Sequence, residues 1–198
     1  MACPDSWYLS GLFLLLNFTM INCSIFKTHS ETVPRASTTI DNFLDNVRNG
    51  TWQDPVLKVR NNKADKASLE CLTLSGEFSK RNSQSLIKHS GLICIDIDVK
   101  DNPEVQSKRQ ALMDDKYTYS VFTSTGGYGL AILFRIDPER HLDAFFGLSK
   151  YIADTYHLVV DQSCKDVTRL RYVSWDPDLY KADKLPPIFK HYLEKPKF

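Results

Sequence analysis

The sequence predicts a mixed α+β or α/β fold in which helices flank a sheet. Two apolar segments, 117–124 and 130–136, are separated by the glycine-rich turn TGGYG and have the pattern of a β-hairpin. A third apolar run, GLICIDIDV at 91–99, has the composition of a buried strand. A long helix is predicted over 138–156, so strands and helices alternate along the chain.

Size and charge are those of an ordinary globular protein. The 198 residues suffice for one domain with a sizeable core. The 25 basic and 24 acidic residues nearly cancel, so any surface for nucleic acid must be a local patch. Residues 52–93 hold such an excess of basic residues, although a solvated face explains it equally well. Five cysteines without zinc-site spacing, with Cys94 inside the apolar run, predict reduced thiols in a cytoplasmic protein.

The first residues are apolar, but they lack the pattern of a signal peptide. No basic residue precedes the stretch 7–21, and no small-x-small cleavage site follows it. We expect residues 1–19 to lie outside the fold, with Met20 as the true start; export of the protein is the alternative. Residues 20–182 are expected to form one domain and residues 183–198 a peripheral C-terminal extension. No stable membrane association is expected, since the apolar stretch is short for a membrane helix.

The N-terminal part is predicted to contain two helices and a strand. The first helix spans 37–50, with serine or threonine as its N-cap and glycine at its end. The second spans 54–69, where an aspartate serves as N-cap and a proline as the first helical residue. A strand at 71–78 and a polar, basic loop at 79–91 follow.

The C-terminal part continues the alternation. A capped helix is predicted over 102–113, and short strands over 158–161 and 170–176. The helix at 138–156 has apolar residues at helical spacing, a pattern that is more often core than a ligand site. These residues are Leu142, Phe145, Phe146, Ser149, Ile152, Ala153 and Tyr156.

Two aspartates, Asp96 and Asp98, interrupt the apolar run 91–99. In a strand, residues two apart point to the same face, so the two carboxylates lie side by side. The other face is expected to pack in the core, with Ile93, Ile95, Ile97 and Val99. Neighbouring carboxylates repel each other, so a divalent metal, an arginine or solvent must compensate them. Oxygen-rich pairs suit Mg²⁺ or Mn²⁺, and an exposed strand end is the alternative.

Two further segments could complete a site. The glycines within 123–134 let the backbone approach a ligand, and successive N–H groups there can cradle a phosphate; an ordinary hairpin is the alternative. Asp161 ends a predicted strand and could be a third metal carboxylate. Lys165, Arg169 and Arg171 follow it and could contact phosphates, or form a salt-bridged turn. Together these features predict metal-assisted phosphoryl transfer.

Five segments of the chain resemble, in the same order, a known family. The resemblance covers residues 21–182 and includes SIFKTH (24–29), SGEFSKRN (75–82), LIKHSGLICIDID (86–98), FTSTGGYGLAILFRI (122–136) and VDQSCKDVTRLRYVSWDPDLY (160–180). In these segments the chain resembles the N-terminal domain of virulence-associated protein E-type proteins of bacterial mobile elements. That domain belongs to the archaeo-eukaryotic primase (primase–polymerase) superfamily. The resemblance implies an α+β fold with an RRM-like mixed sheet flanked by helices and an N-terminal α/β unit.

The resemblance also implies template-directed nucleotidyl transfer with two divalent ions, in replication of a mobile genetic element. Asp96, Asp98 and Asp161 match the catalytic and metal-binding motifs. The candidate nucleotide-binding residues are Ser124, Gly126, Gly127, Gly129, Lys165 and Arg169, with Lys88 and His89 as further phosphate contacts. The implied cofactor is Mg²⁺ or Mn²⁺. The implied partners are nucleoside triphosphates, a single-stranded DNA template and a separately encoded helicase.

One position departs from the family pattern and keeps other functions open. Ala131 stands where related primases carry a histidine and this subfamily often a lysine. Either Arg135, Lys165 or Lys88 substitutes for it, or catalysis is weak or absent. A catalytically degenerate domain that binds nucleic acid or a partner is therefore the alternative. A haloacid-dehalogenase-like phosphatase is a third hypothesis, because DIDV matches that nucleophile motif, but about 90 residues precede the motif and no Asp-Asp pair follows at a strand end after residue 115.

Overall fold

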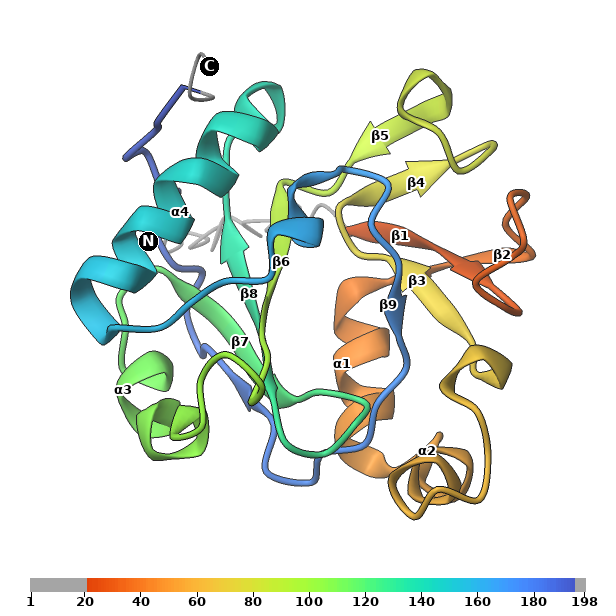
Figure 1. The fold of residues 1–198 in the computed structure, drawn as a ribbon. Coiled ribbons are helices and arrows are strands. Elements are labelled where there is room, and N and C mark those ends of the chain that lie inside the picture. The colour runs from red at the N-terminus through yellow and green to blue at the C-terminus, as the bar shows by residue number, and fades with distance from the viewer. Residues whose placement is uncertain (1–20, 195–198) are drawn as a thin grey trace, which may run out of the picture.

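The computed structural model describes residues 21–194, and these form a mixed α+β fold, as the sequence predicts (Figure 1). The strands form antiparallel sheets, and four α-helices pack around them. Among the described residues, no helix is long and apolar enough to cross a membrane. The expectations for residues 1–19, and for Met20 as the start, lie outside the described residues.

The larger apolar sheet contains the predicted hairpin and the aspartate-bearing strand, and we call it the hairpin sheet. Its order is β10-β7-β8-β6, with each neighbouring pair antiparallel. Its strands are β6 (Leu92–Ile97), β7 (Thr118–Thr123), β8 (Leu130–Arg135) and β10 (Tyr180–Lys181).

A second four-stranded sheet, the N-terminal sheet, has the order β2-β1-β3-β9. Its strands are β1 (Asn22–Phe26), β2 (Ala36–Thr39), β3 (Cys71–Thr73) and β9 (Arg171–Tyr172). A separate two-stranded sheet pairs β4 (Gly76–Phe78) with β5 (Leu86–His89).

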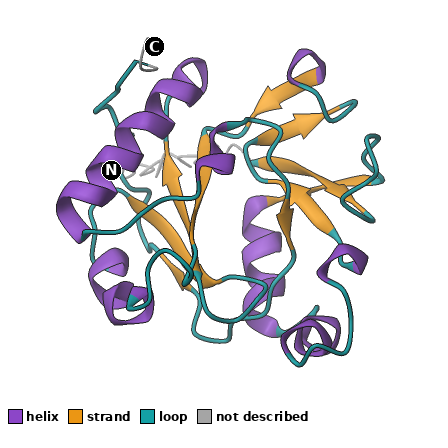
Figure 2. Cartoon of the chain, in the orientation of Figure 1, coloured by secondary structure: helices purple, strands orange, loops and turns teal. Residues whose placement is uncertain are grey.

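The helices lie on both sides of the hairpin sheet (Figure 2). They are α1 (Ile40–Asn49), α2 (Gln53–Arg60), α3 (Arg109–Met113) and α4 (His141–Tyr156). Short 3₁₀ turns span Lys66–Ser68, Ser83–Ser85, Val105–Lys108, Pro138–Arg140 and Gln162–Lys165.

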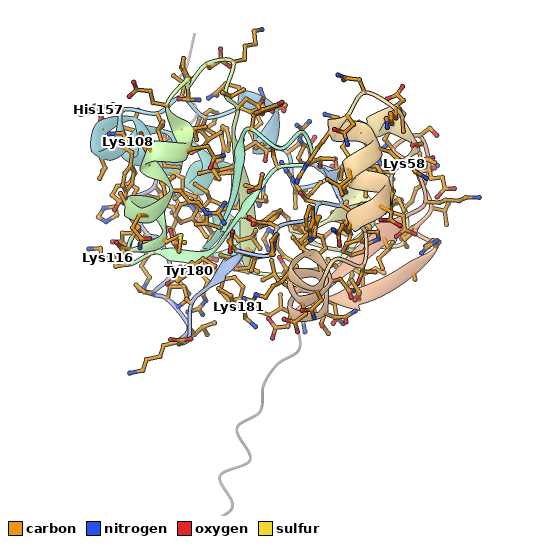
Figure 3. All side chains as sticks on the ribbon, turned by 90° about the horizontal axis from the view of Figure 1, so that it is seen from below. Lys58, Lys108, Lys116, His157, Tyr180 and Lys181 are labelled. Atoms are coloured by element: carbon orange, nitrogen blue, oxygen red, sulfur yellow. The ribbon has the colours of Figure 1, made fainter. Side chains whose placement is uncertain are left out.

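The hairpin sheet buries both faces, and each face has its own hydrophobic core. On one face, Ile93, Ile95 and Ile97 pack with residues of α4 and form the first core. On the other face, α1 lies between the two sheets and forms the second core, in which Phe43 packs against Phe122 (Figure 1). Seen from below, Lys58 of α2 and Lys108 beside α3 mark the two halves of the molecule (Figure 3).

The first helix forms as its sequence predicts, because both ends are capped locally. The Thr39 side chain accepts a hydrogen bond from the N–H of Asn42 at 3.1 Å, and Gly50 ends the helix in the left-handed region with φ +83°. Its apolar residues at helical spacing are all buried, and they include Phe43 and Val47.

The region after α1 differs from the prediction. The second helix ends at Arg60 rather than near residue 69, and Asn62 has a left-handed φ of 56° that no helix can continue through. The predicted strand at 71–78 is two strands, β3 and β4, in different sheets, because β3 pairs with β1 and β9 while β4 pairs with β5. The loop expected at 79–91 contains β5.

The two short strands predicted near the C-terminus are mostly extended loops. Residues 158–161 form no strand, but they run beside β6, because the N–H of Asp161 donates to the carbonyl of Asp96 at 2.9 Å. The Asn102 side chain holds the same segment by bonding both the carbonyl and the N–H of Val159. Of the predicted strand at 170–176, only β9 is formed.

Part of the extension expected over 183–198 is not peripheral, because the chain from β10 onward stays on the fold as far as Phe189. β10 joins the edge of the hairpin sheet, and Phe189 is fully buried in the first core. The N–H of Phe189 donates to the carbonyl of Arg135 at 2.8 Å. The predicted apolar face of α4 is also shifted, because Leu142 and Ala153 are exposed while Leu148 is buried.

Candidate functional site

A cavity of about 660 Å³ lies beside β6 and β9, so residues of both sheets reach it. The hairpin sheet and its loops contribute Asp96, Asp98, Ser124, Thr125 and Gly126. The segment that connects the two sheets contributes Asp161, Ser163, Asp166, Thr168, Arg169, Leu170, Arg171 and Tyr172. The N-terminal side contributes His29, Lys66 and Arg81.

Asp96 is the most buried carboxylate of this cavity, with 7% of its surface exposed. Its Oδ1 forms an ion pair with Arg171, and its Oδ2 lies 3.9 Å from the guanidinium of Arg169. The two arginines therefore share a face, as their spacing predicts. Burial of Arg171 lowers the pKa of its guanidinium below the usual value, and the ion pair offsets part of the cost of burying both charges.

The ion pair leaves Asp96 incompletely satisfied. Arg171 occupies its Oδ1, whereas its Oδ2 accepts no hydrogen bond from the described residues and has only the guanidinium of Arg169, at 3.9 Å. The oxygens of a buried carboxylate normally accept hydrogen bonds, so Oδ2 can accept a cation or a donor from a ligand.

Asp161 is held at the cavity by its own turn. Its side chain accepts hydrogen bonds from the N–H of Ser163 at 2.9 Å and the hydroxyl of Ser163 at 2.5 Å, and it pairs with Arg169 at 3.1 Å. Partial burial alone would raise the pKa of Asp161, but the Ser163 hydrogen bonds and the charges of Arg169 and Lys66 lower it below its usual value. The carboxylate is therefore ionised at neutral pH.

Asp96 and Asp161 come close enough together to hold one divalent cation. One ligand atom each from Asp96, Asp161 and the buried Cys164 lie within 4.8 Å of one another. Two carboxylates suit Mg²⁺ or Mn²⁺, and Arg171 would have to turn away from Asp96 to free its oxygen. The donor set therefore fits one ion, with the arginines as competing cations.

Asp98 lines the same cavity but stands apart from this group. β6 ends at Ile97, and Asp98 is exposed beyond the strand end. The expectation that Val99 packs in the core is wrong, since Val99 is 40% exposed.

The glycine loop between β7 and β8 is shaped by a close approach at Gly129, a left-handed backbone at Gly127 and hydrogen bonds from Arg60. A Cβ on Gly129 would lie 2.7 Å from the carbonyl oxygen of Ile97, so only glycine fits beside the end of β6. Gly127 has a φ of +89°. Arg60 of α2 holds the loop by donating to the carbonyls of Ser124 and Thr125, each at 3.2 Å.

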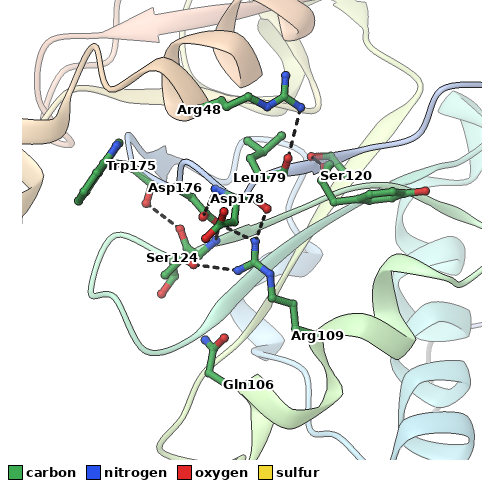
Figure 4. Close-up of polar contacts among 12 residues, drawn as sticks. Arg48, Gln106, Arg109, Ser120, Ser124, Trp175, Asp176, Asp178 and Leu179 are labelled. Atoms are coloured by element: carbon green, nitrogen blue, oxygen red, sulfur yellow. Dashed lines mark hydrogen bonds and ion pairs between the residues drawn. The ribbon is translucent and has the colours of Figure 1, made fainter.

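Asp176 fixes the start of the glycine loop (Figure 4). It is 4% exposed, and its Oδ2 accepts from the N–H of Thr123 at 2.6 Å and pairs with Arg109 at 2.8 Å. Its Oδ1 accepts from the N–H of Asp178 at 3.1 Å. This network ties the end of β7 to the segment after β9, with every carboxylate oxygen satisfied.

The structure brings together most, but not all, of the residues that the sequence predicts for the site. Asp96, Asp98, Asp161, Ser124, Gly126 and Arg169 line the cavity. Gly127 and Gly129 shape the loop behind it, and Lys165 is exposed outside the lining. Lys88 and His89 lie on β5, where Lys88 faces Glu77 in register and His89 Nε2 is 3.0 Å from His141 Nδ1.

Sequence reasoning missed the N-terminal side of the cavity. Lys66 and Arg81 belong to the basic excess of residues 52–93, but nothing in the sequence separates them from the other lysines and arginines there. His29 follows β1, and its place at the cavity depends on tertiary packing. Arg60 and Asp176 have structural roles. Asp176 lies in the segment SWDP (174–177), which belongs to the stretches that carry the resemblance, but no sequence pattern marks Arg60.

Comparison with known proteins places the chain in one family. Neither the curated proteins nor the solved structures compared with this chain gave a match. A family model described as "BT4734-like, N-terminal domain" matches residues 64–180, which is more than half of the chain. The matched region runs from before β3 to the start of β10 and includes the three aspartates and Arg169. The chain therefore belongs to the BT4734-like N-terminal domain family.

Proposed function

We propose that this protein is a primase–polymerase-like nucleotidyltransferase that uses a divalent cation, nucleoside triphosphates and a single-stranded DNA template. One observation carries the proposal: Asp96, Asp98 and Asp161 line one cavity together with the serine–glycine segment and Arg169. Carboxylates for a cation beside cations for phosphate are what metal-assisted phosphoryl transfer requires. We place this activity in the replication of a mobile element in the cytoplasm, with a separately encoded helicase.

The order of elements supports an RRM-like sheet. The chain runs β6, α3, β7, β8, α4 and then the extended segment 158–161, which is the β-α-β-β-α-β order. The segment 158–161 lies beside β6, so the spatial order 158–161, β6, β8, β7 matches that of an RRM-like sheet, with β10 added at the far edge. The N-terminal sheet, together with α1 and α2, would form the proposed N-terminal unit.

The residues would divide the work as follows. Asp96 and Asp161 would hold the cation, which when bound would supply Lewis-acid activation of the phosphoryl group and of the attacking hydroxyl. Asp98, which lines the same cavity and is exposed at the strand end, would complete the carboxylate set. Arg169 would balance negative charge on the transferred phosphate, and the serine–glycine segment that lines the cavity would lie beside the phosphates.

Primer extension and de novo synthesis on single-stranded DNA, with Mg²⁺ or Mn²⁺, test this function. The wild type is expected to synthesise, whereas Asp161→Asn should not. Asp101→Asn is the matched control, because Asp101 is exposed nearby and does not line the cavity. Absence of synthesis by the folded wild type with every nucleotide and metal would reject the enzyme. Turnover of p-nitrophenyl phosphate in the same samples would favour the phosphatase instead.

A catalytically degenerate binding domain is the second candidate, and Ala131 favours it. Ala131 faces Asp96 directly across the β6–β8 pair and is fully buried in the second core. It offers no polar group where the family pattern has one. Arg135 does not replace it, because Arg135 donates to the carbonyl of Pro186 on the tail. Calorimetric titration with Mn²⁺ separates the candidates, since a degenerate site should bind the ion poorly.

A further inference from the structure

The cavity has two walls of opposite charge, and only one of them is compensated. On the carboxylate side, Asp96 pairs with Arg171 and Asp161 pairs with Arg169. On the other side, Lys66 and Arg81 form what we call the cation wall, and the His29 side chain lines the cavity beside them. Within residues 21–194, none of these three side chains forms an ion pair with a carboxylate.

The cation wall is fixed in place by the protein. Arg81 donates from Nη2 to the carbonyl of His29 at 3.1 Å and from Nε to the carbonyl of Glu31 at 3.4 Å. The main-chain N–H of Arg81 also donates to the carbonyl of Thr32 at 2.7 Å. These contacts join the loop after β1 to the loop after β4, so the guanidinium is held at the cavity by neutral carbonyls that leave its charge uncompensated.

Lys66 reaches the cavity from a different segment. It begins the 3₁₀ turn before β3, and the Asp65 side chain caps that turn by accepting from the N–H of Ala67 at 2.8 Å. The Lys66 ammonium lies 5.2 Å from the centroid of the Tyr172 ring, which also lines the cavity. A cation over a ring face is held without losing its charge.

We propose that Lys66 and Arg81, with His29 beside them, bind phosphate groups of the ligand that occupies this cavity. Cations at a cavity that pair with no carboxylate bind anions, and a guanidinium matches phosphate oxygens with parallel N–H donors. A cavity with cations on one wall and partly available carboxylates on the other fits a ligand that carries phosphates and a metal ion together. The inference deepens the proposed function and rests on it for the source of the phosphate: a nucleoside triphosphate or the backbone of the template.

Binding measurements without any divalent metal test the wall independently of synthesis. Inorganic triphosphate, a deoxynucleoside triphosphate and a single-stranded oligothymidylate are titrated in chelator against the wild type, Lys66→Gln and Arg81→Gln. Each variant should weaken binding of at least one probe about tenfold, the loss expected for one charge-assisted contact. Loss confined to the two triphosphates identifies the nucleotide as the phosphate source, and loss confined to the oligothymidylate identifies the template.

Three controls keep the outcome decisive. Lys80→Gln removes an exposed charge next to Arg81 that does not line the cavity, and it should change each affinity less than about twofold. Arg81→Lys should restore much of the binding that Arg81→Gln loses. Lys66→Gln removes no hydrogen bond of the described residues, so its effect is not one of misfolding.

For the oligothymidylate, each lost contact should also lower the slope of affinity against salt by about 0.7. Equal affinities of the wild type, Lys66→Gln and Arg81→Gln for all three probes would overturn the inference, as would a wild type that binds none of them. A wild type that binds phosphate through these residues but performs no synthesis would retain the inference and reject the proposed enzyme.

Discussion

Two buried aspartates each pair with an arginine, but they do so in different ways. Asp176 accepts two main-chain hydrogen bonds besides its ion pair with Arg109, so both of its oxygens are satisfied within the protein. Asp96 pairs with Arg171 through Oδ1, but its Oδ2 has only Arg169 at 3.9 Å, and the residue lines the cavity. The difference indicates that Asp176 serves the fold and that Asp96 is available to a ligand.

The largest expected effect comes from Asp96. Asp96→Asn should lower synthesis by about 10³-fold or more, because the group that holds the cation loses its charge. The same change leaves Arg171 buried without a counter-ion and should lower the free energy of unfolding by about 3 kcal/mol. Adding Arg171→Met should restore most of that stability and none of the synthesis. Primer extension and urea unfolding measure the two quantities, and synthesis by the double variant would contradict a ligand role for Asp96.

Asp176 should respond differently to the same treatment. Asp176→Asn should lower the free energy of unfolding by about 3 kcal/mol. The new amide NH₂ group would face a main-chain N–H that now donates a hydrogen bond to the carboxylate, and two donors cannot pair. Adding Arg109→Met should not restore stability, since the main-chain donors would still lack an acceptor. Urea unfolding of both variants gives the answer. Full recovery in the double variant would mean that Asp176 is a simple ion pair, like Asp96.

The glycine loop connects the surroundings of the two aspartates and gives a smaller effect. Gly129→Ala should destabilise the protein by about 2 kcal/mol, because the added methyl would press on the carbonyl of Ile97 next to Asp96. Gly126→Ala is the control, since nothing lies within 4 Å of a Cβ there. Its effect should stay within about 0.5 kcal/mol. Thermal unfolding that shows equal shifts for both variants would contradict the close contact at Gly129.

The smallest effect tests whether an unsatisfied buried atom always marks a site. His141 Nε2 is buried without a hydrogen-bond partner among the described residues, and His141 lies outside the cavity lining. Burial lowers the pKa of His141 to about 4, with His89 lowering it further and Asp166 opposing. Burial likewise lowers the pKa of His89 to about 4, with Asp137 opposing.

The sign of the pH effect follows from these two histidines. Their folded pKa lies below the unfolded value of 6.5, so the unfolded chain binds more protons between pH 6.5 and 4. Stability is complete above about pH 6.5 and should fall by roughly 1 kcal/mol from pH 7 to pH 6. His141→Gln should flatten this profile in urea unfolding without changing synthesis, whereas His157→Asn should leave the profile unchanged. Loss of synthesis in His141→Gln would extend the site to this pair.

The elements that the sequence predicts well carry complete local signals. The β7–β8 hairpin has two apolar strands around glycines, and α1 has both caps and its buried face within a short segment. The division of residues 71–78 into β3 and β4 has no local signal, because it depends on partners far away in sequence. The end of α2 at Arg60 did have a local signal, because Asn61 and Asn62 follow it and asparagine is a poor helix former that tolerates the left-handed conformation of Asn62.

The same reasoning explains which site residues could be predicted. Asp96 stands out because charged residues rarely interrupt apolar runs, and Asp161 stands out because it ends the apolar run 158–160. Arg169 stands out because it alternates with Arg171. The cation wall and the histidine beside it have no such signal, because His29, Lys66 and Arg81 come from separate segments that share no motif. Only the packing of the N-terminal sheet against the connecting segment places them together.

The position of α1 has a practical consequence for expressing the protein. The family match begins at residue 64, after α1 and α2. Yet α1 belongs to the core on one face of the hairpin sheet, where Phe122 and Leu133 are fully buried. A fragment cut at residue 64 would present these side chains to water as a continuous apolar surface, and such surfaces promote aggregation. A soluble expression unit must therefore begin before β1, well upstream of the boundary that sequence similarity marks.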